Sequence, residues 1–167
     1  MKIFSIQYFD ELFNLANRSQ RLRLHVNLHY SYLDPCQKLF NVIKLNSYIC
    51  PHRHKADSKD ELLLAVKGLF GLIIFNHQGI IESIQLFGSE KYIDKPSIAM
   101  GLEVPSDAWH TVIALVDNSI LFEVKNGPFR PEHSKEFAPW APKEGAKNAY
   151  AYFVKLKKEC LKQLEAT

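Results

Sequence analysis

The sequence predicts an all-β protein, built as one barrel with a helix at each end of the chain, and three observations support this prediction. Between residues 21 and 126, apolar and polar residues alternate over short segments, with the period of two that is typical of half-buried strands. Turn sequences such as Pro105-Ser106-Asp107 and Asp117-Asn118-Ser119 separate these segments at short intervals. At both ends of the chain, in contrast, apolar residues recur every three or four positions, as on one face of a helix.

A chain of 167 residues corresponds to a single domain, and its 47% of hydrophobic residues is enough for a sizeable core. We expect an N-terminal helix over residues 1–20, a β-barrel over 21–126, a wrapping loop over 127–145 and a C-terminal helix over 146–167. In the first helix Tyr8 and Leu12 lie on one apolar face, and Ser5 is the expected N-cap. The loop is expected to wrap the barrel because it is rich in proline, phenylalanine and tryptophan.

The first expected strand begins at Arg21 and has an unusually polar face. Leu22, Leu24, Val26 and Leu28 alternate there with arginine, histidine and asparagine residues. Further strands are expected over residues 38–45, 47–51, 62–66, 69–76, 80–87, 99–104, 111–116 and 120–124. Many short strands at such spacing indicate a sandwich or a barrel rather than alternating strands and helices.

Charge and composition exclude several classes of protein. The net charge of +3 arises largely from lysines near the C-terminus, without the basic stripe of a nucleic-acid-binding protein. The longest uninterrupted apolar stretch, Leu72 to Phe75, is too short to cross a membrane. Asp10 and Glu11 lie where a signal peptide needs apolar residues, and three cysteines without close spacing suit a reducing compartment, so we expect a cytoplasmic protein. Exposed sheet edges or the N-terminal helix could form a homodimer.

Histidines and a glutamate form the most informative pattern in the sequence. On a strand, His52 and His54 project to the same face because residues two apart share a face. Glu61 opens the next expected strand, and His110 begins a later one. Three imidazoles and a carboxylate can bind one divalent transition metal and still leave coordination positions open. This ligand set does not choose among Fe, Mn, Ni, Co and Zn.

The same residues resemble the two motifs of the cupin superfamily. The first motif corresponds to His52, His54, Glu61 and Gly68, with the usual six residues between the glutamate and the glycine. The second corresponds to Gly101, Pro105 and His110. Two departures are present: six residues separate His54 from Glu61 instead of three or four, and Asp107 replaces the turn glycine of the second motif. The resemblance implies a cupin-type jelly-roll β-barrel with a metal site.

From about residue 20 to residue 145 the chain also resembles the WbuC-type cupin-fold metalloproteins. The most discriminating matches are the segments Gly127-Pro128-Phe129 and Trp140-Ala141-Pro142. Proteins of this type are often encoded among enzymes of bacterial O-antigen and other surface-polysaccharide assembly. The resemblance therefore implies that context and a metal site, but it supplies neither a substrate nor a reaction.

Three further residues are candidates for catalysis. Glu123 and Lys125 share one face of an expected strand, so they could be a general acid or base and an anion contact beside the metal. A structural ion pair at the rim of the barrel is the equal alternative. His29, on the polar face of the first strand, could also move a proton, or it could belong to a solvated sheet face.

Four residues are candidates for substrate binding: Arg23, Gln37, Tyr48 and Trp109. Arg23 and Gln37 could line the barrel mouth and bind a hydroxyl-rich or anionic ligand, and a solvated face is the alternative for Arg23. Tyr48 is expected on the face of the metal histidines, where it could bind a ligand or simply pack with its hydroxyl satisfied. Trp109 fits sugar recognition or, alternatively, the core.

These observations lead to three hypotheses about function. The first is a metal-dependent enzyme, such as an isomerase or epimerase, that acts on a carbohydrate or sugar-nucleotide intermediate of bacterial surface-polysaccharide biosynthesis. The second is an iron-dependent oxygenase. The third is a non-catalytic module that binds a small molecule, possibly a sugar derivative, in a metal-dependent way or regulates another process.

Overall fold

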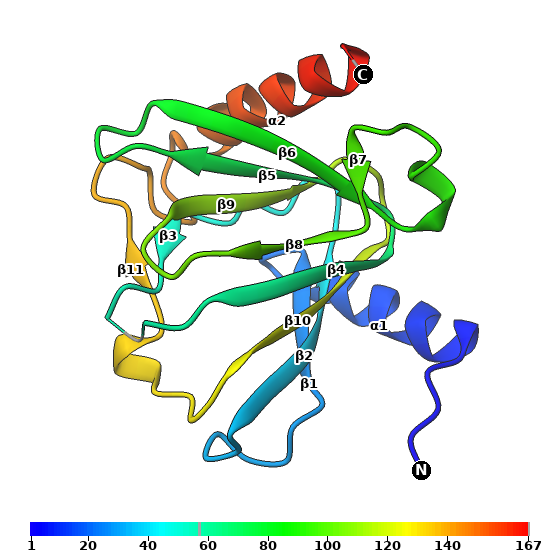
Figure 1. The fold of residues 1–167 in the computed structure, drawn as a ribbon. Helices are drawn as coiled ribbons and strands as arrows, with labels where there is room; N and C mark the ends of the chain where they lie inside the picture. Colours follow the sequence, from blue (N-terminus) through cyan, green and yellow to red (C-terminus); the bar gives the residue numbers. More distant parts are fainter. Residues whose placement is uncertain (57, 167) are drawn as a thin grey trace.

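The computed structural model describes residues 1–56 and 58–166, and it contains two facing sheets with a helix at each end of the chain (Figure 1). Asp57 and Thr167, the last residue of the expected C-terminal helix, lie outside the described residues. The predicted all-β barrel with terminal helices is confirmed.

The first sheet contains, in spatial order, β1 (Arg23–Asn27), β2 (Cys36–Ile43), β10 (Ser119–Asn126), β4 (Glu61–Lys67) and β8 (Gly101–Val104). The second sheet contains β11 (Glu136–Phe137), β3 (His52–Arg53), β9 (Trp109–Ala114), β5 (Leu69–Phe75), β6 (Ile81–Gly88) and β7 (Ile98–Ala99). The described strand pairs are antiparallel apart from β6 and β7. Two short 3-10 helices, η1 (Glu90–Tyr92) and η2 (Pro131–His133), lie in the connecting loops.

The two α-helices cover different sheets. Helix α1 (Ile6–Arg18) begins after Ser5, whose hydroxyl accepts a hydrogen bond from the backbone N–H of Tyr8 at 3.2 Å. It packs on the first sheet, and α2 (Ala149–Glu165) packs on β5 and β6 of the second (Figure 1). None of the helices in the described part of the chain has both the length and the apolar character needed to cross a membrane.

The barrel interior is apolar at one end. Phe70 and Phe87 are fully buried there, with stacked rings whose centroids are 5.2 Å apart. Gly68 makes the tight connection from β4 to β5 with a φ of +94°, and a Cβ at this position would lie 2.2 Å from the hydroxyl of Ser119. This glycine of the first motif is therefore required for close packing at the apolar end.

The polar face of strand β1 points toward the barrel interior. Leu24 and Val26 pack outward with the cluster under α1, whereas Arg23 and the following His29 are buried on the other side. The polar face of this strand therefore points into the barrel and contributes to its interior.

Two expected strands differ from the structure. Residues 47–51 form no strand, because side chains satisfy their backbone: Thr111 donates to the carbonyl of Ile49 at 2.7 Å, and Arg23 donates to that of Tyr48 at 2.9 Å. Pro51 also lacks the N–H that a ladder needs. The strand expected over residues 99–104 is divided into β7 and β8.

Candidate metal centre

The structure brings the four predicted metal-binding residues together from both sheets. His52 on β3 lies directly opposite His110 on β9, Glu61 opens β4 in the facing sheet, and His54 follows β3. Their candidate ligand atoms all lie within 4.8 Å of one another, and each residue is at most 5% exposed. Oε2 of Glu61 lies 3.1 Å from Nε2 of His54 and 3.6 Å from Nε2 of His110.

Backbone carbonyls orient the three imidazoles. Nδ1 of His52 donates to the carbonyl of Cys50 at 2.9 Å, and Nδ1 of His110 donates to that of Ala108 at 2.9 Å. Nδ1 of His54 donates to the carbonyl of Ser134. Because a carbonyl can only accept, each Nδ1 carries the proton and each Nε2 keeps a free lone pair. Nε2 of His54 is buried and has no hydrogen-bond partner. This arrangement fits one divalent transition metal ion held by three Nε2 atoms and one carboxylate oxygen.

Lys125 positions Glu61 for that role. The two residues are cross-strand partners, and the Lys125 ammonium donates to Oε1 of Glu61 at 2.8 Å and to Oε1 of Glu123 at 2.9 Å. Oε2 of Glu61 therefore remains directed at the imidazoles. Burial alone raises the pKa of Glu61, but Lys125, His110 and His54 together lower it well below its usual range. Glu61 is thus held as a carboxylate.

The charge state of His52 also suits a metal ligand. Burial, the ammonium of Lys135 and the neighbouring His110 hold the pKa of His52 well below its usual value. A neutral imidazole is the form that binds a metal ion.

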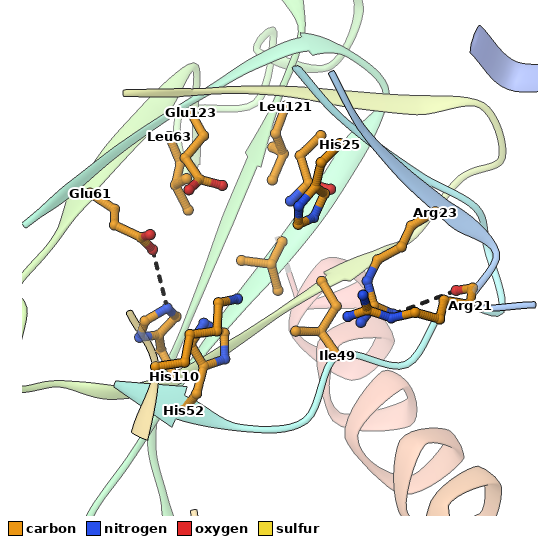
Figure 2. Close-up of a pocket in the computed structure, with 13 residues that line it drawn as sticks. Arg21, Arg23, His25, Ile49, His52, Glu61, Leu63, His110, Leu121 and Glu123 are labelled. Atoms are coloured by element: carbon orange, nitrogen blue, oxygen red, sulfur yellow. Dashed lines mark hydrogen bonds and ion pairs between the residues drawn. The ribbon is translucent and has the colours of Figure 1, made fainter. Parts of the chain in front are cut away.

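Three of the four residues adjoin a cavity with two parts. The inner chamber, next to His52, Glu61 and His110, has a volume of about 30 Å³, which is room for about one water molecule. The outer chamber, toward the mouth, has a volume of about 280 Å³. Three residues line both chambers: His25, Glu123 and Lys135. Figure 2 shows Glu61 and His110 pointing toward one another, with Glu123 and His25 across the cavity from His52.

The remaining candidate residues fall into two groups. Glu123 lines both chambers, Lys125, His29 and Gln37 line the outer one, and Arg23 lines the inner one. Arg23 is also held by Glu144, and the amide nitrogen of Gln37 donates to three carbonyls of the loop over residues 31–34.

Tyr48 and Trp109 do not reach either chamber. Tyr48 donates its hydroxyl to the carbonyl of Pro142 at 2.7 Å, because residues 47–51 are not a strand and the period of two does not apply to them. Trp109 is 5% exposed and packs against Trp140, and the guanidinium of Arg53 lies 4.2 Å from its ring centroid. These contacts support the packing alternatives for both residues.

Sequence reasoning did not single out three residues of the cavity: His25, Asn41 and Lys135. His25 shares the polar face of β1 with Arg23, which was a usable signal. Desolvation and the nearby charge of Lys135 lower the pKa of His25 to about 4, so this histidine is neutral, although part of its side chain faces the open cavity. Asn41 interrupts a mostly apolar strand, which was a second signal. Lys135 lies in a loop, and no local sequence pattern there indicates that its side chain lines the cavity.

Comparison with solved structures confirms the fold. Protein SO0799 from Shewanella oneidensis matches with a TM-score of 0.61 and 9% identity, over 89% of this chain and 94% of its own. Oxalate oxidase in complex with the substrate analogue glycolate matches with a TM-score of 0.51 and 10% identity, over 72% of this chain and 57% of its own. KdgF from Halomonas sp. matches with a TM-score of 0.48 and 14% identity, over 66% of this chain and 83% of its own. The predicted cupin jelly-roll is therefore confirmed, as a fold.

Sequence comparison gives a family but no activity. No protein of curated function matches this chain. The model of a family described as a domain of unknown function, DUF6016, matches residues 4–87. This segment covers about half of the chain, from α1 through most of β6, and it includes His52, His54 and Glu61. The chain has a cupin fold, carries a candidate metal-binding group and belongs to the DUF6016 family.

Proposed function

We propose that this protein is a metal-dependent enzyme that acts on a carbohydrate or a sugar derivative, in the manner of an isomerase or epimerase. The observation that carries this proposal is the convergence of three free Nε2 atoms and Oε2 of Glu61 at the end of a cavity. A divalent transition metal ion bound there would supply Lewis-acid polarisation of a carbonyl or hydroxyl oxygen.

Glu123 supplies a proton-transfer group in the same cavity. Its carboxylate lines both chambers, so it faces the metal-binding group and a ligand in the outer chamber at once. The Lys125 ammonium holds Oε1 of Glu123 at 2.9 Å and orients the carboxylate. A carboxylate in this position can remove a proton from a carbon or hydroxyl next to the polarised oxygen and return it. His29, in the outer chamber, is the second proton-transfer candidate.

The outer chamber suits a small polar ligand with one flat face. Its wall combines polar side chains with the rings of Tyr32 and Phe129, whose centroids are 4.9 Å apart. A volume of about 280 Å³ is near the lower limit of ordinary small-molecule sites, which favours a ligand of about the size of one sugar unit. The resemblance to WbuC-type proteins supports a place in bacterial surface-polysaccharide biosynthesis.

The metal is tested first. Protein purified without an affinity tag or added metal is compared by elemental analysis with the double variant His52→Ala/His110→Ala. We expect near-stoichiometric metal that is lost in the double variant, because two of four ligands are removed. The control is His133→Ala, which replaces an exposed histidine that lines neither chamber. No metal in any of these proteins, even after metal is supplied, would contradict the proposal.

Catalysis is tested with Glu123→Gln, which keeps the shape of the side chain. An enzyme should lose most of its turnover on the converted sugar or sugar nucleotide and keep most of its affinity for it. If the metal-loaded protein binds sugars but converts none of a broad panel, the hypothesis of a non-catalytic binding module replaces that of an enzyme. Iron as the bound metal, together with turnover-linked oxygen uptake, would instead identify an oxygenase.

A further inference from the structure

Lys135 differs from the other cations that line the two chambers. Arg21 and Arg23 form ion pairs with Glu144, and Lys125 is bonded to two carboxylates. Among the residues that the structure describes, Lys135 has neither an ion pair nor a hydrogen bond through its ammonium group, although it lines both chambers. It lines the inner chamber together with His52, Glu61 and His110. The ammonium therefore lies close to the metal-binding group and has no partner there.

The backbone on both sides of Lys135 is attached to the metal-binding strand. The carbonyl of Ser134 accepts the hydrogen bond from Nδ1 of His54. On the other side, Glu136 forms two hydrogen bonds of 2.7 Å with the guanidinium of Arg53, and β11 pairs with β3. Lys135 is therefore held in a defined position relative to the metal ligands, rather than on a freely moving loop.

Two buried polar atoms in the same walls also lack partners. Oδ1 of Asn41, in the inner chamber, and Nε2 of His29, in the outer chamber, have no hydrogen-bond partner, and these residues are 7% and 8% exposed. A buried polar group without a hydrogen-bond partner destabilises the folded state. Such atoms therefore mark places where a ligand or an ordered water completes the structure.

The charge balance of the chambers favours a negatively charged ligand. Among the described residues that line them, Glu61 and Glu123 are the carboxylates, and Lys125 and Lys135 offset their charge. The lining residues Arg21 and Arg23 share one further carboxylate, that of Glu144. The charge of a bound divalent ion is then left without compensation inside the barrel. An anion bound near Lys135 would compensate it and would give the Lys135 ammonium the charged partner that it lacks.

We propose that the ligand of this cavity carries an oxyanion, a carboxylate or a phosphate, which binds the Lys135 ammonium where the inner and outer chambers meet. Its hydroxyl groups reach Asn41 in the inner chamber and His29 in the outer one. The substrate class is thus a sugar acid or a sugar phosphate. This inference rests on the proposed function, because it names the class of substrate for that same site.

The test is calorimetric titration with D-glucuronate, D-glucose 6-phosphate and D-glucose. Each sugar is titrated into protein as purified and into protein treated with a chelator. Wild type is compared with Lys135→Gln, Lys135→Arg and Lys147→Gln, the last being an exposed lysine outside the cavity. Metal content and thermal unfolding of each variant show whether it is folded and loaded like wild type.

We expect wild type to bind at least one charged sugar more tightly than glucose, and the preferred sugar distinguishes a carboxylate from a phosphate. Lys135→Gln should weaken that binding by about tenfold to a hundredfold, since a charged hydrogen bond is lost. Lys135→Arg should restore part of it, and Lys147→Gln should change nothing. The loss should also occur in chelator-treated protein, where the metal cannot hold the oxyanion.

The proposal is overturned if neither charged sugar binds better than glucose, or if folded Lys135→Gln binds as wild type does. It is also overturned if affinity depends on the metal alone. These outcomes leave the metal-dependent enzyme untouched when the protein still retains metal. Conversely, binding that depends on Lys135 in a protein that never retains metal supports the oxyanion site and refutes the proposed function.

Discussion

The two ends of the barrel interior are built from the same strands and have opposite chemistry. On β10 the inward residues change from Leu121 to Glu123 and then to Lys125. On β4 the change runs the other way, from Glu61 to Leu63, because the strands are antiparallel. The register thus collects the apolar residues at one end of the barrel and the polar residues at the other.

The apolar end of the barrel mainly stabilises the fold, whereas the polar end holds the candidate functional site. The apolar end is closely packed, and Phe70 and Phe87 are completely buried there. The polar end keeps two chambers of about 30 Å³ and 280 Å³ and leaves polar atoms of Asn41 and His29 without partners. A barrel that only had to be stable would fill this space with apolar side chains, so the polar end reflects a functional requirement.

Phe70→Ala should give the largest loss of stability, and it tests whether the apolar end holds the barrel together. Phe70 is 0% exposed, so its truncation leaves a cavity, and we expect a loss of about 4 kcal/mol in the free energy of unfolding. Urea unfolding measures this loss, and elemental analysis should find the metal content of the folded variant unchanged. A variant that loses metal while it remains folded would show that the two ends are coupled.

Lys125→Met should cost about 3 kcal/mol, because it leaves the buried carboxylates of Glu61 and Glu123 without their cation. The measurement is urea unfolding of chelator-treated protein at neutral pH. Lys162→Met is the matched control, since it breaks an exposed pair with Glu159 and should cost less than about 0.5 kcal/mol. Equal effects of the two substitutions would contradict the role assigned to Lys125.

Asn41→Leu should leave stability unchanged or raise it by up to about 1 kcal/mol, because it removes a buried oxygen that has no partner. The same substitution should weaken binding of the preferred charged sugar. The matched reverse change is Leu121→Asn, at the residue paired with Asn41 in the ladder, and it should destabilise the protein by about 2 kcal/mol. Loss of stability in Asn41→Leu would mean that this residue supports the fold rather than the ligand.

The smallest expected effect is a pH dependence from His25, because its side chain is exposed to the open cavity and solvent screening leaves only part of the effect of its pKa shift. Its pKa is about 4 in the folded protein, below the usual 6.5 of the unfolded chain. The unfolded state therefore binds more protons between these values, so stability falls as the pH drops from about 6.5 to about 4 and then levels off. NMR titration of the imidazole gives the pKa directly, and urea unfolding of His25→Gln should lack this part of the slope. A pKa near 6.5 would refute the interpretation.

Much of the fold, and the four residues of the candidate metal-binding group, could be predicted from the sequence because they depend on local patterns. The period of two along β1 and β10 places alternate residues on one face, and Ser5 starts α1 by its own hydrogen bond. His52 and His54, followed by Glu61 and Gly68 and later by Pro105 and His110 in the order of the two motifs, predicted a metal-binding group.

The tertiary structure alone decided which candidates enter the cavity. Tyr48 is directed to Pro142 and Trp109 to the core, whereas Lys135 reaches the metal-binding group from a loop about eighty residues further along the chain. The pairing of Lys125 with Glu61 and the carbonyls that orient the imidazoles likewise join distant segments. Such contacts depend on strand register and on the path of the wrapping loop, which long-range packing determines and local periodicity does not.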